Sequence, residues 1–298
     1  HEVYMPLIPL DIPSGVYRNG TDLQSNGRWR DANLIRWIDN TMRPMGGWRT
    51  QSTNASTSSI RGMLSWGDNS SDPWVGVERP ELSRTQPATT WALDTWGENL
   101  VGCTEDDGKI YEWALATGTP AAVITNAPTN NRSLVVTEER FLFALGAGGN
   151  PRKVQWSDRE DNTTWTPAVT NEAGDIELNT TGQIMAGIRV RGQTLILTST
   201  DAHVANYIGP PYVYGIERVG SSCGLASNKA IAAVDIGAFW MGAHAFYSYT
   251  GGSAQELQCE VSDYVFGDMN RGQISKAFAV ANSNFGEIFW FYPSSDST

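Results

Sequence analysis

One short pattern recurs along this chain, and it restricts the folds that the chain can adopt. The clearest copy is Lys229–Gly252, KAIAAVDIGAFWMGAHAFYSYTGG, where Ile236-Gly237 and Ala243-His244 separate three apolar and aromatic runs. Short runs of this composition, ended by glycine or small residues, are typical of β-strands joined by tight turns. We therefore expect strands at Ile231–Asp235, Ala238–Gly242 and Ala245–Tyr249.

The same pattern recurs at intervals of roughly 30 to 50 residues, a spacing typical of propeller blades and other repeat arrays. Each copy has an apolar strand, a polar or glycine turn, a very apolar strand, and a third strand ending in an aromatic residue. One such small sheet is marginally stable in water, so the copies must pack against one another. We predict an all-β protein, a β-propeller-like array of antiparallel blades with an extended N-terminal arm. The copies are Ile60–Ser83, Thr90–Leu115, Arg132–Asp158, Met185–Ile208, Lys229–Gly252 and Ser275–Pro293.

Residues 1–55 differ from the repeats and are expected to form the extended arm, a docking segment, whereas residues 56–298 form the repeat domain. Prolines and glycines punctuate the stretch MPLIPLDIPSGVYRNG, and proline disfavours helix. A polar low-complexity linker, TQSTNASTSS, follows at residues 50–59. Since the last repeat stops inside a strand meander, we expect the blade array to be incomplete at its C-terminal end.

The arm and the repeats also differ in charge. Residues 1–49 contain six arginines and five carboxylates, a net charge of +1. Because the net charge of the whole chain is −11, residues 50–298 carry a net charge of −12. This acidity argues against a protein that grips nucleic acid over its whole surface. No apolar run approaches the roughly 20 residues of a membrane-spanning helix, so we expect no membrane span.

The most distinctive stretch of the arm is TDLQSNGRWRDANLIRWIDNTMRPMGGWRT, in which arginines alternate with tryptophans. It is interpreted as a hairpin that packs on the repeat domain, or as a docking element for another protein, because Trp and Arg are favoured interface anchors. A nucleic-acid contact is a third interpretation, and Asp31 and Asp39 within the stretch argue against it. The candidate interface residues are Arg28, Trp29, Arg30, Arg36, Trp37, Arg43 and Trp48.

Residue types that carry catalysis or bind metals are sparse. The three histidines are His1 at the terminus, His203 without a carboxylate or cysteine at metal-ligand spacing, and His244 at an expected turn. The three cysteines are widely spaced and form no CxxC motif, which indicates reduced thiols rather than disulfides or a zinc site. We therefore expect no catalytic, metal-binding or cofactor-binding residues, no cofactor and no enzymatic activity.

Two further motifs have a structural and a functional interpretation. In WSDREDNTTW, Asp158, Glu160 and Asp161 offer a carboxylate pair of the kind used in glycoside hydrolysis. Aspartates also stabilise turns through their own backbone, and this is the role that we expect. The glycines of LGAGGN suggest a phosphate loop, but no GKS, GKT or helix follows them, so a wide hairpin turn explains them better.

The phrase RWRDANLIRWIDNTMRPMGGWR resembles the N-terminal signature of tail proteins of short-tailed bacteriophages, the packaged-DNA stabilisation or tail nozzle and hub family. The phrases TWALDTWGENLVGC, TEERFLFALGAGG, CEVSDYVFGDMNRGQ and NFGEIFWFYP are similar to the same family. The resemblance implies a structural protein of the virion, made in the host cytoplasm and located in the phage tail.

The resemblance also implies partners. It implies a homo-oligomeric ring, a hexamer in the family, which contacts adaptor or portal-side tail proteins and fibres. Double-stranded DNA would pass through its channel without sequence recognition, and the ring would retain the packaged genome before ejection. The alternative is a carbohydrate-binding or glycan-cleaving propeller of a tail adhesin. A lectin of this kind should repeat its sugar-contacting residues in every unit, whereas the turns of this chain differ.

Overall fold

The computed structural model describes residues 12–47, 49–50, 60, 62–78 and 91–297. The chain divides into two compact units. The arm unit comprises His1–Ala55 and Gln258–Met269, and the body comprises Ser56–Leu257 and Asn270–Thr298. The sequence analysis expects an arm of residues 1–55 and a repeat domain of residues 56–298.

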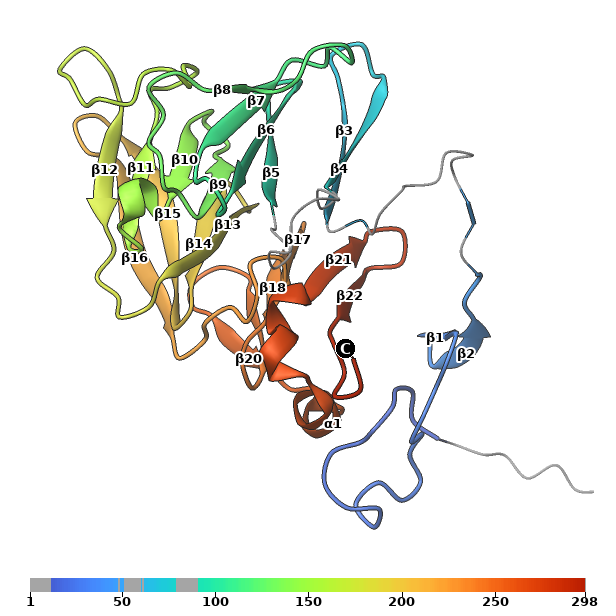
Figure 1. Ribbon diagram of the computed structural model, residues 1–298. Helices are drawn as coiled ribbons and strands as arrows, with labels where there is room; N and C mark the ends of the chain where they lie inside the picture. The colour runs from blue at the N-terminus through green and yellow to red at the C-terminus, as the bar shows by residue number, and fades with distance from the viewer. Residues whose placement is uncertain (1–11, 48, 51–59, 61, 79–90, 298) are drawn as a thin grey trace, which may run out of the picture. The chain divides into compact units, whose positions relative to one another are not determined.

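The body consists of antiparallel sheets that follow one another in chain order (Figure 1). In each four-stranded sheet, every strand pairs with its neighbours in sequence, so the sheets are meanders. The first blade contains β5 (Trp91–Trp96), β6 (Asn99–Thr104), β7 (Ile110–Trp113) and β8 (Ala122–Val123). The second contains β9 (Ser133–Val136), β10 (Leu142–Leu145), β11 (Lys153–Trp156) and β12 (Gly174–Glu177).

The third and fourth blades have the same plan, and a two-stranded hairpin lies at each end of the described series. The third blade contains β13 (Ile184–Val190), β14 (Gln193–Thr198), β15 (Asp201–Gly209) and β16 (Val213–Ser221). The fourth contains β17 (Ile231–Val234), β18 (Gly237–Met241), β19 (Phe246–Tyr249) and β20 (Gln255–Leu257). The hairpins are β3 (Gly62–Gly67) with β4 (Pro73–Glu78), and β21 (Phe278–Asn282) with β22 (Glu287–Phe291). Two 3₁₀ turns occupy Ala147–Gly149 and Arg271–Lys276.

The blades are joined through their first strands. Along the series β3, β5, β9, β13, β17 and β21, each strand contacts the next. Sheets that repeat side by side through their first strands form the radial arrangement of a β-propeller. The predicted fold class, an all-β propeller-like array of antiparallel blades, is therefore confirmed.

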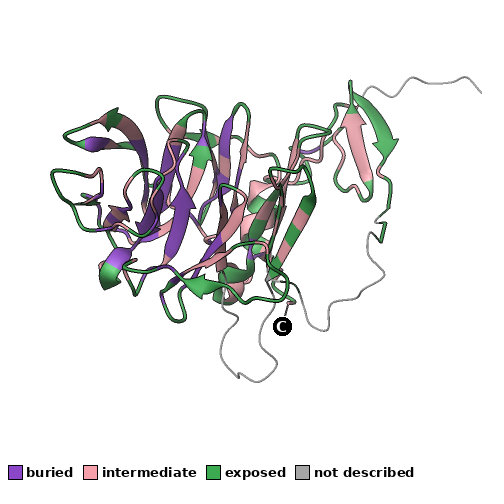
Figure 2. Ribbon diagram, turned by 90° about the horizontal axis from the view of Figure 1, so that it is seen from above, coloured by how far each residue is buried: buried purple, intermediate pink, exposed green. Residues whose placement is uncertain are grey.

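The second blade is buried on both faces. Successive residues of a strand point to opposite faces, and in β9 the side chains of Leu134 and Val136 join a core cluster shared with β5, β6 and β7. Val135, together with Phe143 of β10, joins a different cluster shared with β13 and β14. This arrangement explains the uninterrupted apolar runs SLVV and LFAL, and Figure 2 shows the buried residues along the strands of the body.

The fourth blade matches the pattern from which the fold was predicted. Trp240 is fully buried, and its indole nitrogen donates a hydrogen bond to the carbonyl oxygen of Cys223 at 2.7 Å. Phe246 is also buried, as expected. Phe289 and Trp290, expected to be mostly buried, are only half-buried. Among the described residues their sheet contains only β21 and β22, so no further strand of it covers them.

The described part of the arm unit contains a β-hairpin and a helix. Strands β1 (Ile35–Ile38) and β2 (Thr41–Pro44) pair with each other, and α1 spans Ser262–Asp268. Contacts with residues 16–30 place α1 in this unit: Asn19 donates to the carbonyl oxygen of Cys259 at 2.7 Å, and Arg18 lies over the ring of Tyr264. Within the described ranges, no helix is long and apolar enough to cross a membrane.

Candidate functional site

The β1–β2 hairpin carries three of the predicted interface residues. Asp39 and Asn40 both have positive φ, at 48° and 60°, as the two central residues of a type I′ hairpin turn require. The register pairs Arg36 with Arg43 on one face of the ladder and Trp37 with Met42 on the other. The hairpin is therefore amphipathic, with two arginines on one face and an apolar second face completed by Ile35 and Pro44.

The hairpin forms no buried core of its own. Every residue of β1 and β2 is half-buried or exposed, and Met42 is 40% exposed. Isolated two-stranded hairpins are at best marginally stable in water. This part of the arm therefore has the composition of an interface and little of the packing that would hold it in place.

Three other predicted interface residues hold the arm unit together. Arg28 pairs with the carboxylate of Glu260 and lies over the ring of Tyr17. Trp29 forms a parallel bridge with Val16, and Arg30 pairs with Asp22 at 2.6 Å. The seventh candidate, Trp48, lies outside the described residues. The structure thus divides the described candidates into residues 28–30, which make contacts within the arm unit, and the hairpin residues 36, 37 and 43, of which Arg43 is exposed and the other two are half-buried.

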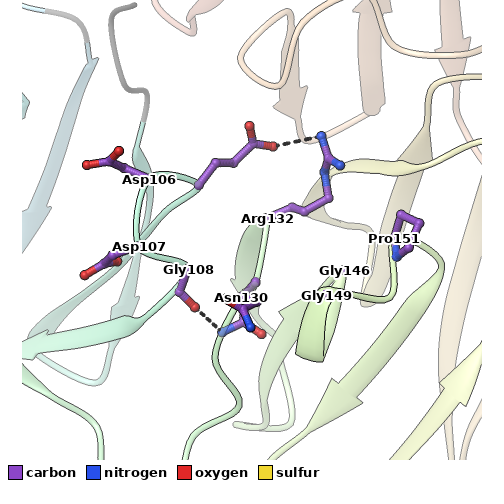
Figure 3. A pocket seen from close by; sticks show the side chains of 10 residues that line it. Asp106, Asp107, Gly108, Asn130, Arg132, Gly146, Gly149 and Pro151 are labelled. Carbon is purple, nitrogen blue, oxygen red and sulfur yellow. Dashed lines mark hydrogen bonds and ion pairs between the residues drawn. The ribbon is translucent and has the colours of Figure 1, made fainter. Parts of the chain in front are cut away.

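A polar hollow of about 250 Å³ lies where the first and second blades meet (Figure 3). The β6–β7 turn, the β8–β9 connection and the β10–β11 turn line it. Arg132 pairs with Glu105 at 3.3 Å, and the amide nitrogen of Asn131 donates to the carbonyl oxygen of Gly108 at 2.8 Å. In Figure 3, Asp106 and Asp107 point away from Arg132.

The contacts in this hollow connect two blades. Gly108 has a φ of +63°, and a Cβ at this position would lie 2.4 Å from Cα of Asn130, so the close approach requires glycine. Asp107 accepts a hydrogen bond from the hydroxyl of Tyr111, which raises the pKa of Tyr111 to about 12. Among the described residues, no group of three or more His, Cys, Asp or Glu side chains is arranged to hold a metal ion. The hollow is best explained as a structural joint.

The carboxylates of the acid-rich loop also have structural roles. Asp158 accepts from the backbone nitrogen of Glu172 at 2.8 Å, and Asp161 accepts from the backbone nitrogen of Thr163 at 2.8 Å. Hydrogen bonds from Thr163 lower the pKa of Asp161. These are the turn-stabilising bonds expected from the sequence. Two of the three cysteines, Cys103 and Cys223, are buried, and the cysteines are free.

A tyrosine–glutamate cluster was not predicted. Tyr207 and Tyr214 are partners in the β15–β16 ladder, and their rings lie 5.7 Å apart. Tyr214 donates to Glu139 at 3.0 Å, and Tyr207 donates to Glu172 at 3.1 Å. The four residues come from three separate parts of the sequence, so no local pattern indicates that they meet.

Comparison with known proteins yields similar folds only. No family model and no curated protein matches the chain. A selenomethionine-substituted virginiamycin B lyase from Staphylococcus aureus has a TM-score of 0.48 at 7% identity, covering 87% of this chain and 85% of the lyase. A streptogramin B lyase structure has a TM-score of 0.44 at 8% identity, covering 78% of this chain and 67% of that chain. The dihydro-heme d1 dehydrogenase NirN has a TM-score of 0.43 at 10% identity, covering 82% of this chain and 57% of that chain.

These structures correct one expectation. The expectation of no enzymatic activity, which was drawn from the sparse histidines and cysteines, is contradicted, because the solved structures of similar fold include lyases and a dehydrogenase. At such low identity they give this chain no substrate and no reaction. Fold does not determine function, so an activity must be argued from particular side chains.

Proposed function

We propose that this protein is a structural component of the tail of a short-tailed bacteriophage. In this proposal it forms a homo-oligomeric ring that conducts double-stranded DNA and retains the packaged genome before ejection. The observation that carries the proposal is the phrase RWRDANLIRWIDNTMRPMGGWR, which resembles the tail nozzle and hub family and spans the amphipathic β1–β2 hairpin.

The geometry of the hairpin supports a docking role. Trp37 and Met42 form an apolar pair on one face, and Arg36 and Arg43 are paired on the other. Tryptophan and arginine are the residues that most often anchor protein interfaces. A neighbouring tail protein, or a second copy of this chain, would bury the apolar face and present carboxylates to the arginines.

The charge distribution supports a conduit for DNA. Each phosphate that Lys or Arg neutralises adds salt-dependent affinity, and many such contacts would slow the passage of the genome. Outside residues 1–49 the chain has a net charge of −12, and the whole chain contains four lysines, Lys109, Lys153, Lys229 and Lys276. A repeat domain of this charge, residues 56–298, guides DNA without gripping it.

Quantitative mass spectrometry of purified phage particles tests this function. The expected result is that the protein is present in a fixed ratio to the portal protein, at a copy number that fits one ring per particle. Its absence from intact particles that contain the other tail proteins would contradict the proposal.

A further inference from the structure

A second and larger hollow lies between the third and fourth blades. Its volume is about 450 Å³, within the range of roughly 300 to 1,000 Å³ that is typical of small-molecule sites. The β14–β15 turn, the end of β16 with the residues after it, and the β18–β19 turn line it. It is built from the same type of turn as the hollow of Figure 3, two blades further along the chain.

The lining is rich in groups that both donate and accept hydrogen bonds. Five serine and threonine side chains contribute hydroxyls, and Asp201, Arg218, His244 and Tyr247 complete the wall. A hydroxyl can donate one hydrogen bond and accept two, whereas a guanidinium can only donate and a carboxylate only accept. The wall therefore offers both kinds of partner at several points.

One oxygen of Asp201 accepts no hydrogen bond from the described residues of the fold. The residue is 5% exposed, and its Oδ1 accepts hydrogen bonds from the hydroxyls of Thr198 and Thr180. Its Oδ2 accepts no hydrogen bond from another described residue, and Nη1 of Arg218 lies 3.9 Å away, too far for one. Oδ2 is not fully buried, and Asp201 lines the hollow, so Oδ2 can accept a hydrogen bond from a group inside it.

The aromatic wall is held rigidly. The ring of Tyr247 stacks on Trp240 at 5.9 Å with an interplanar angle of 26°, and its hydroxyl donates to the carbonyl oxygen of Ser222 at 3.0 Å. Arg271, from the 3₁₀ turn Arg271–Lys276, donates to the carbonyl oxygen of Ala243 on the β18–β19 turn at 3.1 Å and lies 3.4 Å from Nδ1 of His244. A fixed ring beside polar groups suits a ligand with an apolar face and a polar edge.

The charges of the lining favour an uncharged ligand. The carboxylate of Asp201 and the guanidinium of Arg218 oppose each other, so an anionic ligand would meet a negative charge beside the positive one. A sugar ring presents hydroxyls at its edge and C–H groups on its face, and it carries no charge. It matches the acceptor at Oδ2 of Asp201, the donors of Arg218 and the hydroxyls, and the ring of Tyr247.

We propose that the hollow between the third and fourth blades binds one or two pyranose rings of a neutral glycan. Oδ2 of Asp201 accepts hydrogen bonds from the sugar hydroxyls, and Tyr247 contacts the C–H face. This site shares no residue with the β1–β2 hairpin and does not depend on the proposed tail function.

Ligand-observed NMR on the full chain provides the test. The probes are the methyl glycosides of glucose, galactose, mannose and N-acetylglucosamine, with N-acetylneuraminic acid and inorganic phosphate as anionic probes. At least one neutral glycoside is expected to bind with a Kd on the order of 1 mM, since a small polar ligand makes few contacts. Binding of the anionic probes alone, or of none of the probes, would overturn the proposal.

Two variants locate the site. Ser221 lines the hollow, is exposed and makes no side-chain hydrogen bond to another described residue, so Ser221→Trp fills the space without removing a contact. Ser221→Trp is expected to abolish binding, whereas Ser283→Trp, in the exposed β21–β22 turn, leaves binding unchanged. Asp201→Asn is expected to weaken binding at least about tenfold, the loss typical of a hydrogen bond to a charged group. Equal binding by wild type and Ser221→Trp would contradict the assignment even if Asp201→Asn failed to fold.

Discussion

Asp94 and Arg189 form an ion pair between blades that are not adjacent in the chain. Nη2 of Arg189, in β13 of the third blade, lies 2.7 Å from Oδ1 of Asp94, in β5 of the first. The other carboxylate oxygen accepts a hydrogen bond from the backbone nitrogen of Val136, in β9 of the second blade, at 2.8 Å. One side chain thus connects three consecutive blades at their first strands. Burial raises the pKa of Asp94, and the charge of Arg189 opposes this effect.

Asp94→Ala is expected to lower the free energy of unfolding by about 2 kcal/mol, because it removes the connection and leaves the Val136 nitrogen and Arg189 without their acceptor. Arg189 is 42% exposed, so water compensates part of the loss. The matched control is Asp175→Ala, which removes a surface pair with Lys153 and should cost less than about 1 kcal/mol. Denaturant titration of both variants measures the difference, and equal losses would show that Asp94 is not a joint between blades.

Trp240→Ala is expected to cost about 3 to 5 kcal/mol, as large aromatic truncations in cores do. The indole is fully buried, and the truncation also leaves the Cys223 carbonyl without its donor. Tyr212→Ala, at a site that is 76% exposed, should change stability by less than about 0.5 kcal/mol. Thermal and chemical unfolding of the two variants test this difference. A small loss for Trp240→Ala would mean that the fourth blade is not packed as described.

Much of the body could be predicted because its strands coincide with apolar runs of the sequence and its turns with the glycine and small residues between those runs. Three strands of the fourth blade begin and end within one residue of the expected positions. They are Ile231–Val234, Gly237–Met241 and Phe246–Tyr249. The fourth strands of the blades were missed. Strands β8 (Ala122–Val123) and β20 (Gln255–Leu257) are short and largely exposed, so their sequences carry no apolar periodicity. They form because the preceding strand offers an unpaired edge.

The candidate sites could be predicted only in part. A hairpin was one interpretation of the arginine–tryptophan stretch, and the β1–β2 hairpin lies within it at residues 35–44, but its turn at Asp39 and Asn40 was not predicted. The hollow that contains Asp201 combines turns from two blades, and residues as far apart as Thr181 and Tyr247 line it. These residues come together only because the third and fourth blades pack side by side, and the pattern of apolar and turn residues along the sequence does not show how blades pack.

Stability is expected to fall on mild acidification because of His203. Burial lowers the pKa of this histidine, with a smaller contribution from Arg218, while Asp201 opposes the shift. The folded state therefore binds fewer protons than the unfolded state below the ordinary histidine pKa of about 6.5. The stability due to neutral His203 is full above that pH and decreases as the pH falls below it. Denaturant midpoints at pH 7.5 and 5.5 should differ less in His203→Gln than in wild type, and an equal difference would contradict this role.

Trp37→Ala is expected to reduce assembly and to leave the stability of the body unchanged within about 0.5 kcal/mol, because Trp37 is only half-buried and belongs to the arm unit. Leu23→Ala is the control, since Leu23 is 83% exposed and lies in the arm unit outside the hairpin. Mass photometry of the full chain, together with incorporation into particles, measures assembly. Normal assembly of Trp37→Ala would exclude this side chain as an anchor.

Cryo-electron microscopy of the intact phage particle tests the central claim most directly. We predict a ring of propeller-like bodies in the tail, surrounding a channel on the axis of the packaged DNA, with residues 35–44 of each copy buried against a neighbouring chain. Particles whose tail contains no such ring, or a ring in which residues 35–44 contact only solvent, would contradict the account.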